Sequence, residues 1–276
     1  MNKVTKYHNN LNTVPMRKWT TEEQNFFFAI ITEARDKGDD LLRFKKENLI
    51  ELANYSMERN KDLRMVIIDL VDKLESMKYR EQTDNSYTSM ALFQYFKAEW
   101  TSDLSDFTLD VQVSNRFSYI INKLEAEFTY FELKQFTNIR STYAKEMFKK
   151  LKQWRTIGVK EYSVKEFREM LQIPESYRAR EIDTRVLAPI KRELPEYFKN
   201  LRIKRIKGNT RGNPILAYKF IWKPEKTGKW VKNKYKKKKK EKSNLPNWLI
   251  NKSKMDTPIS EKKQKELQNR LKKIRE

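Results

Sequence analysis

Three arginines, Arg178, Arg180 and Arg185, lie in the stretch 176–194, SYRAREIDTRVLAPIKREL. The apolar residues of this stretch recur every four positions, at Ile182, Val186, Ile190 and Leu194. This spacing predicts a helix with one buried stripe and with arginines on its other faces. An α-helix fits the major groove of DNA, where an arginine can pair bidentately with the O6 and N7 atoms of guanine. We therefore interpret the stretch as a helix that reads DNA bases.

A predicted hairpin follows this helix. Two runs that contain apolar residues, 201–206 and 215–222, flank the segment KGNTRGN, whose Gly and Asn residues tolerate the positive φ angles of a tight turn. The candidate DNA contacts of the hairpin are Lys204, Arg205, Lys207, Arg211 and Asn213. A cationic hairpin can lie along the DNA backbone or the minor groove beside a helix in the major groove, as the wing of a winged helix. The alternative is an ordinary surface helix and hairpin with solvated charges.

Positive charge is concentrated in the second half of the 276-residue chain. Residues 1–128 hold 18 Lys and Arg against 21 Asp and Glu, residues 129–222 hold 22 against 10, and residues 223–276 hold 20 against 6. The net charge of +23 indicates a polyanionic partner, either nucleic acid or an acidic membrane surface. We assign three regions on this basis: an N-terminal domain 1–128, a C-terminal domain 129–222 that is the main DNA reader, and a lysine-rich flexible tail 223–276.

The same order of predicted elements occurs twice along the chain. The first half has a helix at 20–34, a short helix at 45–53, a longer helix at 60–77, strands near 91–95 and 107–113, and a closing helix at 114–125. The second half has helices at 141–154 and 163–171, then the arginine-bearing helix and the hairpin. Capping-box spacings start two of the helices, Thr20 with Glu23 and Ser163 with Glu166. The pattern predicts two tandem winged-helix domains, α+β and mainly helical, followed by a basic, disordered tail.

The first copy is the weaker candidate for DNA binding. Its candidate contacts, Arg59, Lys61 and Arg64, surround the start of the helix predicted at 60–77. Acidic residues such as Asp69 and Asp72 accompany them on that helix. Carboxylates repel phosphates, so we expect the first domain to make only a secondary DNA contact.

Chemistry other than binding has few candidates in this sequence. There is no cysteine, and the single histidine, His8, lies in an N-terminal segment expected to be unstructured, which argues against thiolate metal sites and the paired histidines of nicking enzymes. No P-loop and no G-x-S-x-G motif occurs. Asp103, Asp106 and Asp110 are close in sequence, but a solvated strand edge is favoured over a metal site. We expect no enzyme activity, no cofactor and no metal.

The sequence also argues against a membrane location. No apolar run reaches the length of a membrane span, and the N-terminus lacks the apolar core of a signal peptide. We expect a soluble, cytoplasmic protein with double-stranded DNA as its polyanionic partner.

Three segments resemble a known family: YHNNLNTVPMRKWTTEEQNFFFAII, EFTYFELKQFTNIRSTYAKEMFKKLKQWR and IPESYRAREIDTRVLAPIKREL. They are similar to the iteron-binding plasmid replication initiators of theta-type replicons in bacteria, particularly the Gram-positive members. The resemblance extends from residue 7 to about residue 222 and leaves out the lysine-rich tail.

This resemblance implies a mode of action. In that family, two winged helices lie on one face of directly repeated origin sites called iterons, which monomers bind to start replication. Dimers joined through the first domain repress the initiator's own promoter, and the hairpin around Leu109 and Val111 would correspond to the dimer surface. The resemblance also implies contacts with the host replication initiator and the replicative helicase.

Two further expectations concern the DNA site and its reading helix. Two reading helices in successive major grooves lie about 10 bp apart, which predicts a site of about 20 bp. Pro189 falls inside the arginine-bearing helix and predicts a kink there, because proline lacks a backbone N–H donor.

Two other functions remain open from the sequence. One is a two-domain winged-helix transcription regulator without a replication role. The other, from a different class, is a nicking or priming enzyme.

Overall fold

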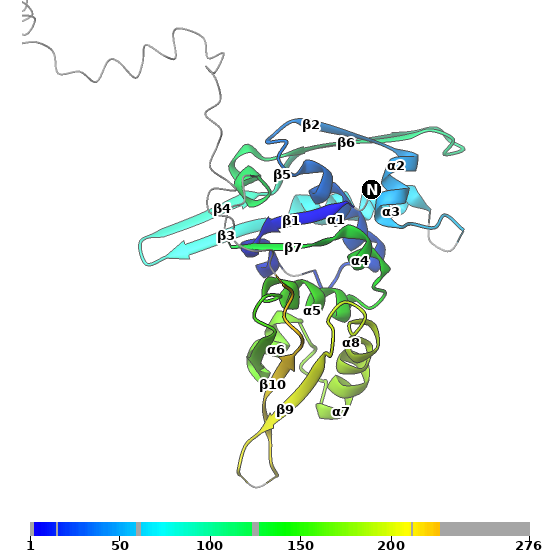
Figure 1. The fold of residues 1–276 in the computed structure, drawn as a ribbon. Helices are drawn as coiled ribbons and strands as arrows, with labels where there is room; N and C mark the ends of the chain where they lie inside the picture. Colours follow the sequence, from blue (N-terminus) through cyan, green and yellow to red (C-terminus); the bar gives the residue numbers. More distant parts are fainter. Residues whose placement is uncertain (1–2, 15, 59–61, 123–126, 211, 227–276) are drawn as a thin grey trace, which may run out of the picture. The chain divides into compact units, whose positions relative to one another are not determined.

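The computed structural model describes residues 3–14, 16–58, 62–122, 127–210 and 212–226 (Figure 1). Three of the predicted DNA contacts, Arg59, Lys61 and Arg211, lie outside the described residues, as does the tail from residue 227 onward.

The first half of the chain contains both helices and strands. In chain order these are β1 (Val4–His8), η1 (Asn9–Thr13), α1 (Thr21–Ala34), β2 (Leu41–Lys45), α2 (Lys46–Ala53), α3 (Leu63–Ser76), β3 (Lys78–Thr83), β4 (Ser86–Ala91), β5 (Phe93–Trp100), β6 (Phe107–Val113), η2 (Asn115–Ile120) and β7 (Phe128–Glu132). The closing helix predicted at 114–125 is wrong over its described part, because residues 115–120 form the short 3-10 helix η2.

The second half repeats part of this order. Its elements are α4 (Leu133–Asn138), α5 (Thr142–Gln153), β8 (Val159–Ser163), α6 (Val164–Met170), α7 (Ala179–Glu181), η3 (Ile182–Leu187), α8 (Ala188–Glu193), β9 (Arg202–Lys207) and β10 (Ile215–Ile221). The predicted hairpin is confirmed as β9 and β10, which pair antiparallel from Arg202 with Ile221 to Lys207 with Ile215.

The two halves share one sheet order. The three-stranded sheets run β2-β6-β5 and β8-β10-β9, so in each copy the strand before the short helix pairs with the last strand of the copy. Between these strands lie α2 and α3 in the first copy, and α6 followed by α7, η3 and α8 in the second. The first copy also contains an inserted hairpin, β3–β4. This confirms the prediction of two tandem winged-helix domains with α+β architecture.

The predicted capping boxes start α1 and α6. The Thr20 N–H donates to Glu23 Oε2 at 2.8 Å, and the Glu23 N–H donates to Thr20 Oγ1 at 3.2 Å. Ser163 and Glu166 form the same pair of bonds at 2.8 Å and 3.1 Å. Each box satisfies backbone donors that a helix start leaves free, which fixes where both helices begin.

The N-terminal segment is a strand and not an unstructured arm. β1 pairs antiparallel with β7, from Val4 with Glu132 to His8 with Phe128. The partner strand follows residue 127, so this two-stranded sheet joins residues on both sides of the domain boundary expected at 128/129. That boundary stays a prediction.

The arginine-bearing helix continues through Pro189 by widening one turn. Residues Ile182–Leu187 form a π-helical segment, in which the Ala188 N–H donates to the carbonyl of Asp183, five residues back. The wider turn lies directly before Pro189, whose ring would clash with the carbonyl four residues earlier in a regular α-helix. The extra residue also lets both Val186 and Leu187 face the core, where they are fully buried.

Helix α5 lies at the centre of the core. Phe148 on α5 is fully buried, and its ring packs edge-on against Phe131 of β7 at 5.1 Å and against Phe198 at 5.7 Å. Phe131 follows the first copy and Phe198 follows α8, so one side chain contacts residues from both halves. One hydrophobic cluster therefore includes α1, α5 and the arginine-bearing helix.

Gly158, directly before β8, provides a test of this packing. Its φ of +77° lies in the left-handed region, and a Cβ there would be 2.7 Å from the Trp222 carbonyl oxygen and 2.6 Å from Pro224 Cγ. We expect Gly158→Ala to lower the free energy of unfolding by about 2–5 kcal/mol, because backbone strain and overpacking add. Urea denaturation followed by circular dichroism measures this loss.

Gly212→Ala is the matched control. Gly212 also has a left-handed φ, +87°, but nothing lies within 4 Å of the added Cβ. Its loss should be about 1–2 kcal/mol, from backbone strain alone. Equal losses for the two variants would contradict the close approach of residues 222–224 to Gly158.

Candidate nucleic-acid interface

The predicted arginines of the second domain are on the outer face of the helix formed by α7, η3 and α8. Arg178, Arg180 and Arg185 are all exposed, whereas Ile182, Val186 and Ile190 are buried as predicted. The helix begins at Arg178, whose backbone N–H donates to Glu181 Oε2 at 2.9 Å. Two of the arginines therefore lie at the first turn and the third lies in the π segment.

An aromatic ring holds the side chain of Arg185. The guanidinium carbon lies 5.3 Å from the ring centroid of Tyr177, and Arg185 Nη1 donates to the Tyr177 hydroxyl at 3.3 Å. This hydroxyl raises the pKa of Arg185, which stays a cation. The stacked guanidinium loses less rotamer freedom on binding than a free one. Tyr177 is not among the residues predicted from the sequence, because it lies in the turn before the helix and outside the periodic pattern of the helix.

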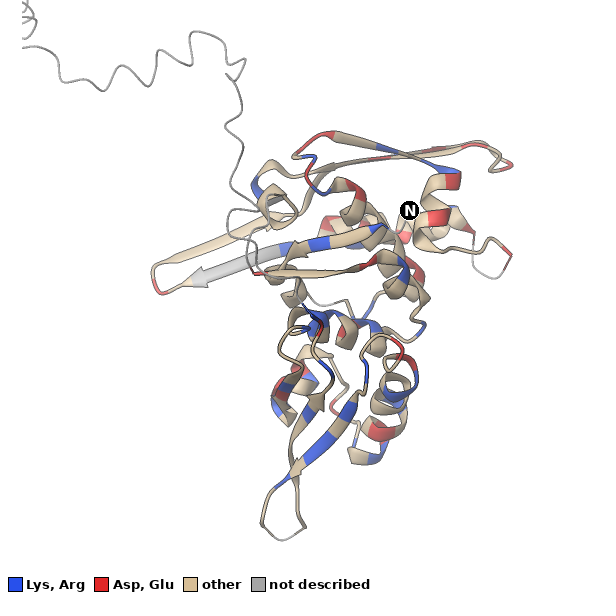
Figure 2. Ribbon diagram, viewed as in Figure 1, with Lys and Arg blue, Asp and Glu red and all other residues tan. Residues whose placement is uncertain are grey.

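The hairpin β9–β10 carries basic residues along its first strand. Lys204, Arg205 and Lys207 are exposed on β9, where Figure 2 shows Lys and Arg in blue. Asn213 is exposed in the turn with a left-handed φ of +43°, and its N–H donates to the Thr210 carbonyl at 2.9 Å. The described basic residues of the predicted wing therefore all face solvent.

An ion pair joins the hairpin to the arginine-bearing helix. Arg205 Nη2 donates to Asp183 Oδ1, so the wing strand β9 and the π segment are linked through their side chains. The link restricts the side chain of Arg205. It also neutralises part of the charge of Arg205, which the sequence could not indicate because 22 residues separate the partners.

This ion pair should stabilise the fold only weakly. Both side chains are about one-third exposed, at 38% and 32%, and a pair of that kind contributes about 0–1 kcal/mol. We expect the coupling free energy between Asp183→Asn and Arg205→Gln in a double-mutant cycle to be below about 1 kcal/mol. Urea denaturation of the four proteins measures it, and a coupling above 2 kcal/mol would contradict a solvent-screened pair.

The corresponding helix of the first domain offers less positive charge. Arg64, its described candidate, is the second residue of α3, and its Nε donates to Asp62 Oδ2 at 2.9 Å. Asp62 is also the N-cap, accepting from the Arg64 backbone N–H at 2.9 Å, and these bonds lower its pKa. Arg64 is therefore held at the helix start by a carboxylate, while Arg59 and Lys61 lie outside the described residues.

The dimer assignment of Leu109 and Val111 needs correction. Both side chains are fully buried in the hydrophobic core, because β6 is the central strand of the sheet β2-β6-β5 and these residues alternate toward the helices. The residue between them, Asp110, lies on the opposite face of the strand, where it is also buried and accepts two bonds from Arg43 at 2.7 Å and 2.6 Å. In this structure Leu109 and Val111 are core residues and do not offer a contact surface.

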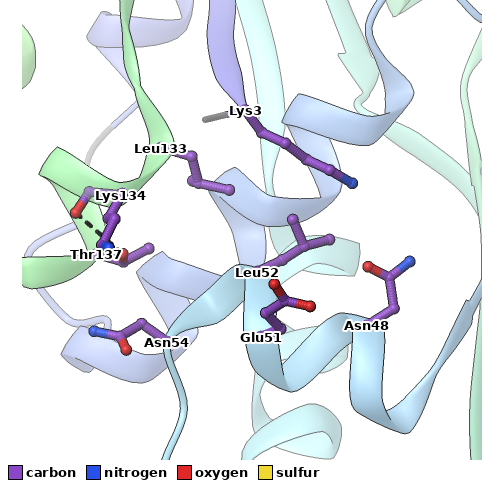
Figure 3. A pocket seen from close by; sticks show the side chains of 8 residues that line it. All are labelled: Lys3, Asn48, Glu51, Leu52, Asn54, Leu133, Lys134 and Thr137. Carbon is purple, nitrogen blue, oxygen red and sulfur yellow. Dashed lines mark hydrogen bonds between the residues drawn. The ribbon is translucent and has the colours of Figure 1, made fainter. Parts of the chain in front are cut away.

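A pocket and an acidic turn of the first half are the other polar features of the described residues considered for chemistry. A cavity of 470 Å³ lies between α2, α4 and Lys3, and Figure 3 shows Glu51, Lys134 and Thr137 among its lining side chains. A hydrogen bond with the Thr101 side chain, followed by bonds from the backbone N–H and the hydroxyl of Ser105, lowers the pKa of Asp103 to about 2 and holds its carboxylate in a turn. Within the described ranges, no group of three His, Cys, Asp or Glu side chains could hold a metal ion.

The helices of the described residues are also too short or too polar to cross a bilayer.

Comparison with protein families shows to which family of winged-helix proteins the chain belongs. The family model described as "Initiator Replication protein, WH1" matches residues 4–152, and the one described as "Initiator Rep protein, WH2" matches residues 163–222. The chain belongs to the initiator replication protein family. Initiator replication proteins are DNA-binding winged-helix proteins and not a catalytic family.

The chain is also similar to two individual replication proteins. A probable replication protein of Bifidobacterium longum is 30% identical over 176 residues, which are 63% of this chain and 58% of that protein. The match thus spans a little more than half of the relative's length. The crystal structure of the Pi initiator protein in complex with iteron DNA aligns with a TM-score of 0.61 at 12% identity, over 81% of this chain and 99% of that chain. At this identity the likeness establishes the fold of this initiator replication protein and no more.

Proposed function

We propose that this initiator replication protein binds directly repeated double-stranded DNA sites at a plasmid origin and starts replication there. The observation that carries the proposal is the basic helix and hairpin of the second domain, found in a member of this family. The helix presents Arg178, Arg180 and Arg185 to solvent, and β9 adds Lys204 and Lys207. A helix that carries arginines fits the major groove of DNA, and a basic hairpin beside it can contact the flanking phosphates.

The two kinds of basic residue have different roles in this proposal. Arg185 reads a base, because its planar guanidinium is held by Tyr177 and can pair bidentately with guanine. Arg178 and Arg180 lie at the helix start and contact bases or phosphates, while the residues of the wing hold the backbone. Arg64 of the first domain, together with Arg59 and Lys61, makes the secondary contact on the same site of about 20 bp.

We further propose that the oligomeric state selects between two activities in the bacterial cytoplasm. A monomer binds the repeats, and a dimer joined through the first domain represses the initiator's own promoter. The origin complex recruits the host replication initiator and the replicative helicase. The dimer contact uses side chains other than Leu109 and Val111, which lie in the core.

Substitution of Arg185 tests whether this residue reads a base or only binds phosphate. We expect Arg185→Ala to weaken binding to the cognate repeat by roughly 5- to 150-fold, the equivalent of about 1–3 kcal/mol, and to change binding to a shuffled duplex far less. Fluorescence anisotropy with both duplexes at one salt concentration measures the two losses.

Lys207→Ala is the matched comparison on the wing. Lys207 is also exposed and cationic, but a lysine holds phosphate without sequence preference. It should weaken both duplexes by the same factor. Equal losses on both duplexes for Arg185→Ala as well would remove Arg185 from the base readers.

The tail from residue 227 should add affinity without sequence preference. Residues 227–276 hold 18 Lys and Arg against 5 Asp and Glu. Deletion after Lys226 should lower affinity for every duplex and flatten the slope of log K against log salt, because fewer counterions are released on binding. An unchanged slope would contradict a phosphate contact by the tail.

The position of this deletion follows from the structure. The Lys223 N–H donates to the Lys199 carbonyl at 2.8 Å, and the Glu225 carboxylate pairs with Lys152 at 2.5 Å. A deletion directly after Trp222 would also remove these bonds, so a loss of DNA affinity could come from lower stability of the fold as well as from lost positive charge.

The alternative function, a transcription regulator without a replication role, requires different DNA sites beside the coding region than an initiator does. An initiator requires tandem repeats of about 20 bp there, with an inverted partial copy at the promoter. A regulator without a replication role requires only the promoter site.

A further inference from the structure

Glu193, the last residue of α8, bonds to the backbone at the start of α5. Its Oε2 atom accepts from the N–H of Arg140 at 2.9 Å and from the N–H of Ser141 at 3.0 Å. Its Oε1 atom accepts from Arg192 Nη2 at 2.9 Å. Ser141 is the N-cap of α5. One carboxylate therefore joins the arginine-bearing helix to the segment that leads into α5.

The position of this carboxylate is unfavourable for its own helix. A negative charge at a helix C-terminus opposes the helix dipole, whereas a negative charge at a helix N-terminus is stabilised. Glu193 lies at the end of α8 and at the start of α5, so α5 offsets the cost in α8. Burial alone would raise the pKa of Glu193, but bonds from two backbone N–H groups and one guanidinium lower it, so the group stays charged. The residue is therefore suited to joining two helices.

The segment that Glu193 holds is also bonded to the first half of the chain. The Thr21 hydroxyl, at the start of α1, donates to the Arg140 carbonyl at 2.7 Å. Both backbone groups of Arg140 are thus engaged, the N–H by the arginine-bearing helix and the carbonyl by α1. Lys145 of α5 donates to Asn25 Oδ1 of α1 at 2.6 Å. A short path of bonds therefore leads from α1 to the arginine-bearing helix.

The geometry of DNA makes such a path relevant to binding. A protein that holds two contacts on one duplex must match their separation to the helical repeat. One extra base pair between the contacts moves one of them by about 3.4 Å and rotates it by about 35°. A rigid joint cannot engage both contacts on such a site, whereas a loose joint can, at the cost of a weaker grip on the correct site.

We propose that Glu193 is a positioning residue that sets the spacing between the two DNA contacts of each site. It fixes the arginine-bearing helix relative to α1 and makes no contact with DNA itself. Helix α3, which carries the proposed contact of the first domain, is joined to α1 by the bond from Lys73 to Glu23. The proposal rests on the proposed function, because it requires both domains to bind one duplex.

The experiment measures how affinity depends on the spacing within the site. The full chain is titrated by fluorescence anisotropy against the cognate repeat and against duplexes with one or two base pairs inserted or deleted between its two halves. We expect wild type to lose about tenfold or more on any of these changes, because the two contacts no longer bind together. Glu193→Ala should bind the cognate repeat about three- to tenfold more weakly, and a change of spacing should then cost it less than about threefold.

Thr21→Ala breaks the same path at its other end. Thr21 follows the N-cap of α1 and its hydroxyl bond to Arg140 is on the surface, so the fold tolerates this change even if Glu193→Ala lowers stability. The variant should reduce the cost of a spacing change by about half or more. Spacing profiles equal to that of wild type in both variants would overturn the proposal.

Glu196→Ala is the matched control. Glu196 is exposed three residues beyond Glu193, and its side chain bonds to Tyr197. The substitution removes the same charge and leaves the path from α1 intact. It should keep the spacing profile of wild type, and a profile as flat as that of Glu193→Ala would assign the effect to charge alone and overturn the proposal.

A half-site duplex separates positioning from a general loss of structure. It holds the contact of the second domain alone, where the arginines are unchanged, so Glu193→Ala should bind it within about twofold of wild type. A loss on the half-site as large as that on the whole repeat would overturn the positioning role. If wild type itself does not prefer the cognate repeat to a shuffled duplex, the proposed function fails as well, which is distinct from specific binding with an unchanged spacing profile.

Discussion

Three lysines of helix α5, Lys145, Lys149 and Lys152, are buried, and the bonds of their amines join α5 to residues from both halves of the chain. Lys145 is fully buried and donates to Asn25 Oδ1 at 2.6 Å and to the Phe136 carbonyl at 2.7 Å. Burial lowers the pKa of this amine well below that of a free lysine. A buried amine is tolerated only where acceptors surround it, so α1 and the end of α4 must sit where they do.

The same helix fixes the far end of the described chain. Lys149 is buried beside Glu146 at 2.8 Å, and Lys152 pairs with Glu225 at 2.5 Å. Residues directly after β10 thus return to α5, which also approaches the N-terminal segment through Lys150 and the Asn12 carbonyl. The hydrogen bonds of one amphipathic helix therefore connect residues from the start, the middle and the end of the two winged helices.

On this shared architecture, the two domains diverge in surface chemistry. Both place a helix between an edge strand and a hairpin. In the second domain the helix and wing are basic, and an aromatic ring and an ion pair restrict Arg185 and Arg205. In the first domain the exposed residues of α3 include Met65, Ile68, Asp72 and Glu75, and Arg64 is paired with Asp62.

The sequence by itself determined the tandem winged-helix fold, because periodicity, capping boxes and turn residues are local properties. It also predicted that Arg178, Arg180 and Arg185 would be exposed, since the apolar stripe of one helix decides which face is buried. Leu109 and Val111 were assigned to a dimer surface by the family resemblance and not by a local pattern, and the packing of helices on the sheet β2-β6-β5 places both side chains in the core. Tertiary structure likewise decided the pairing of β1 with β7 and of Arg205 with Asp183. These contacts join residues far apart in the chain, so no local pattern of one segment could specify them.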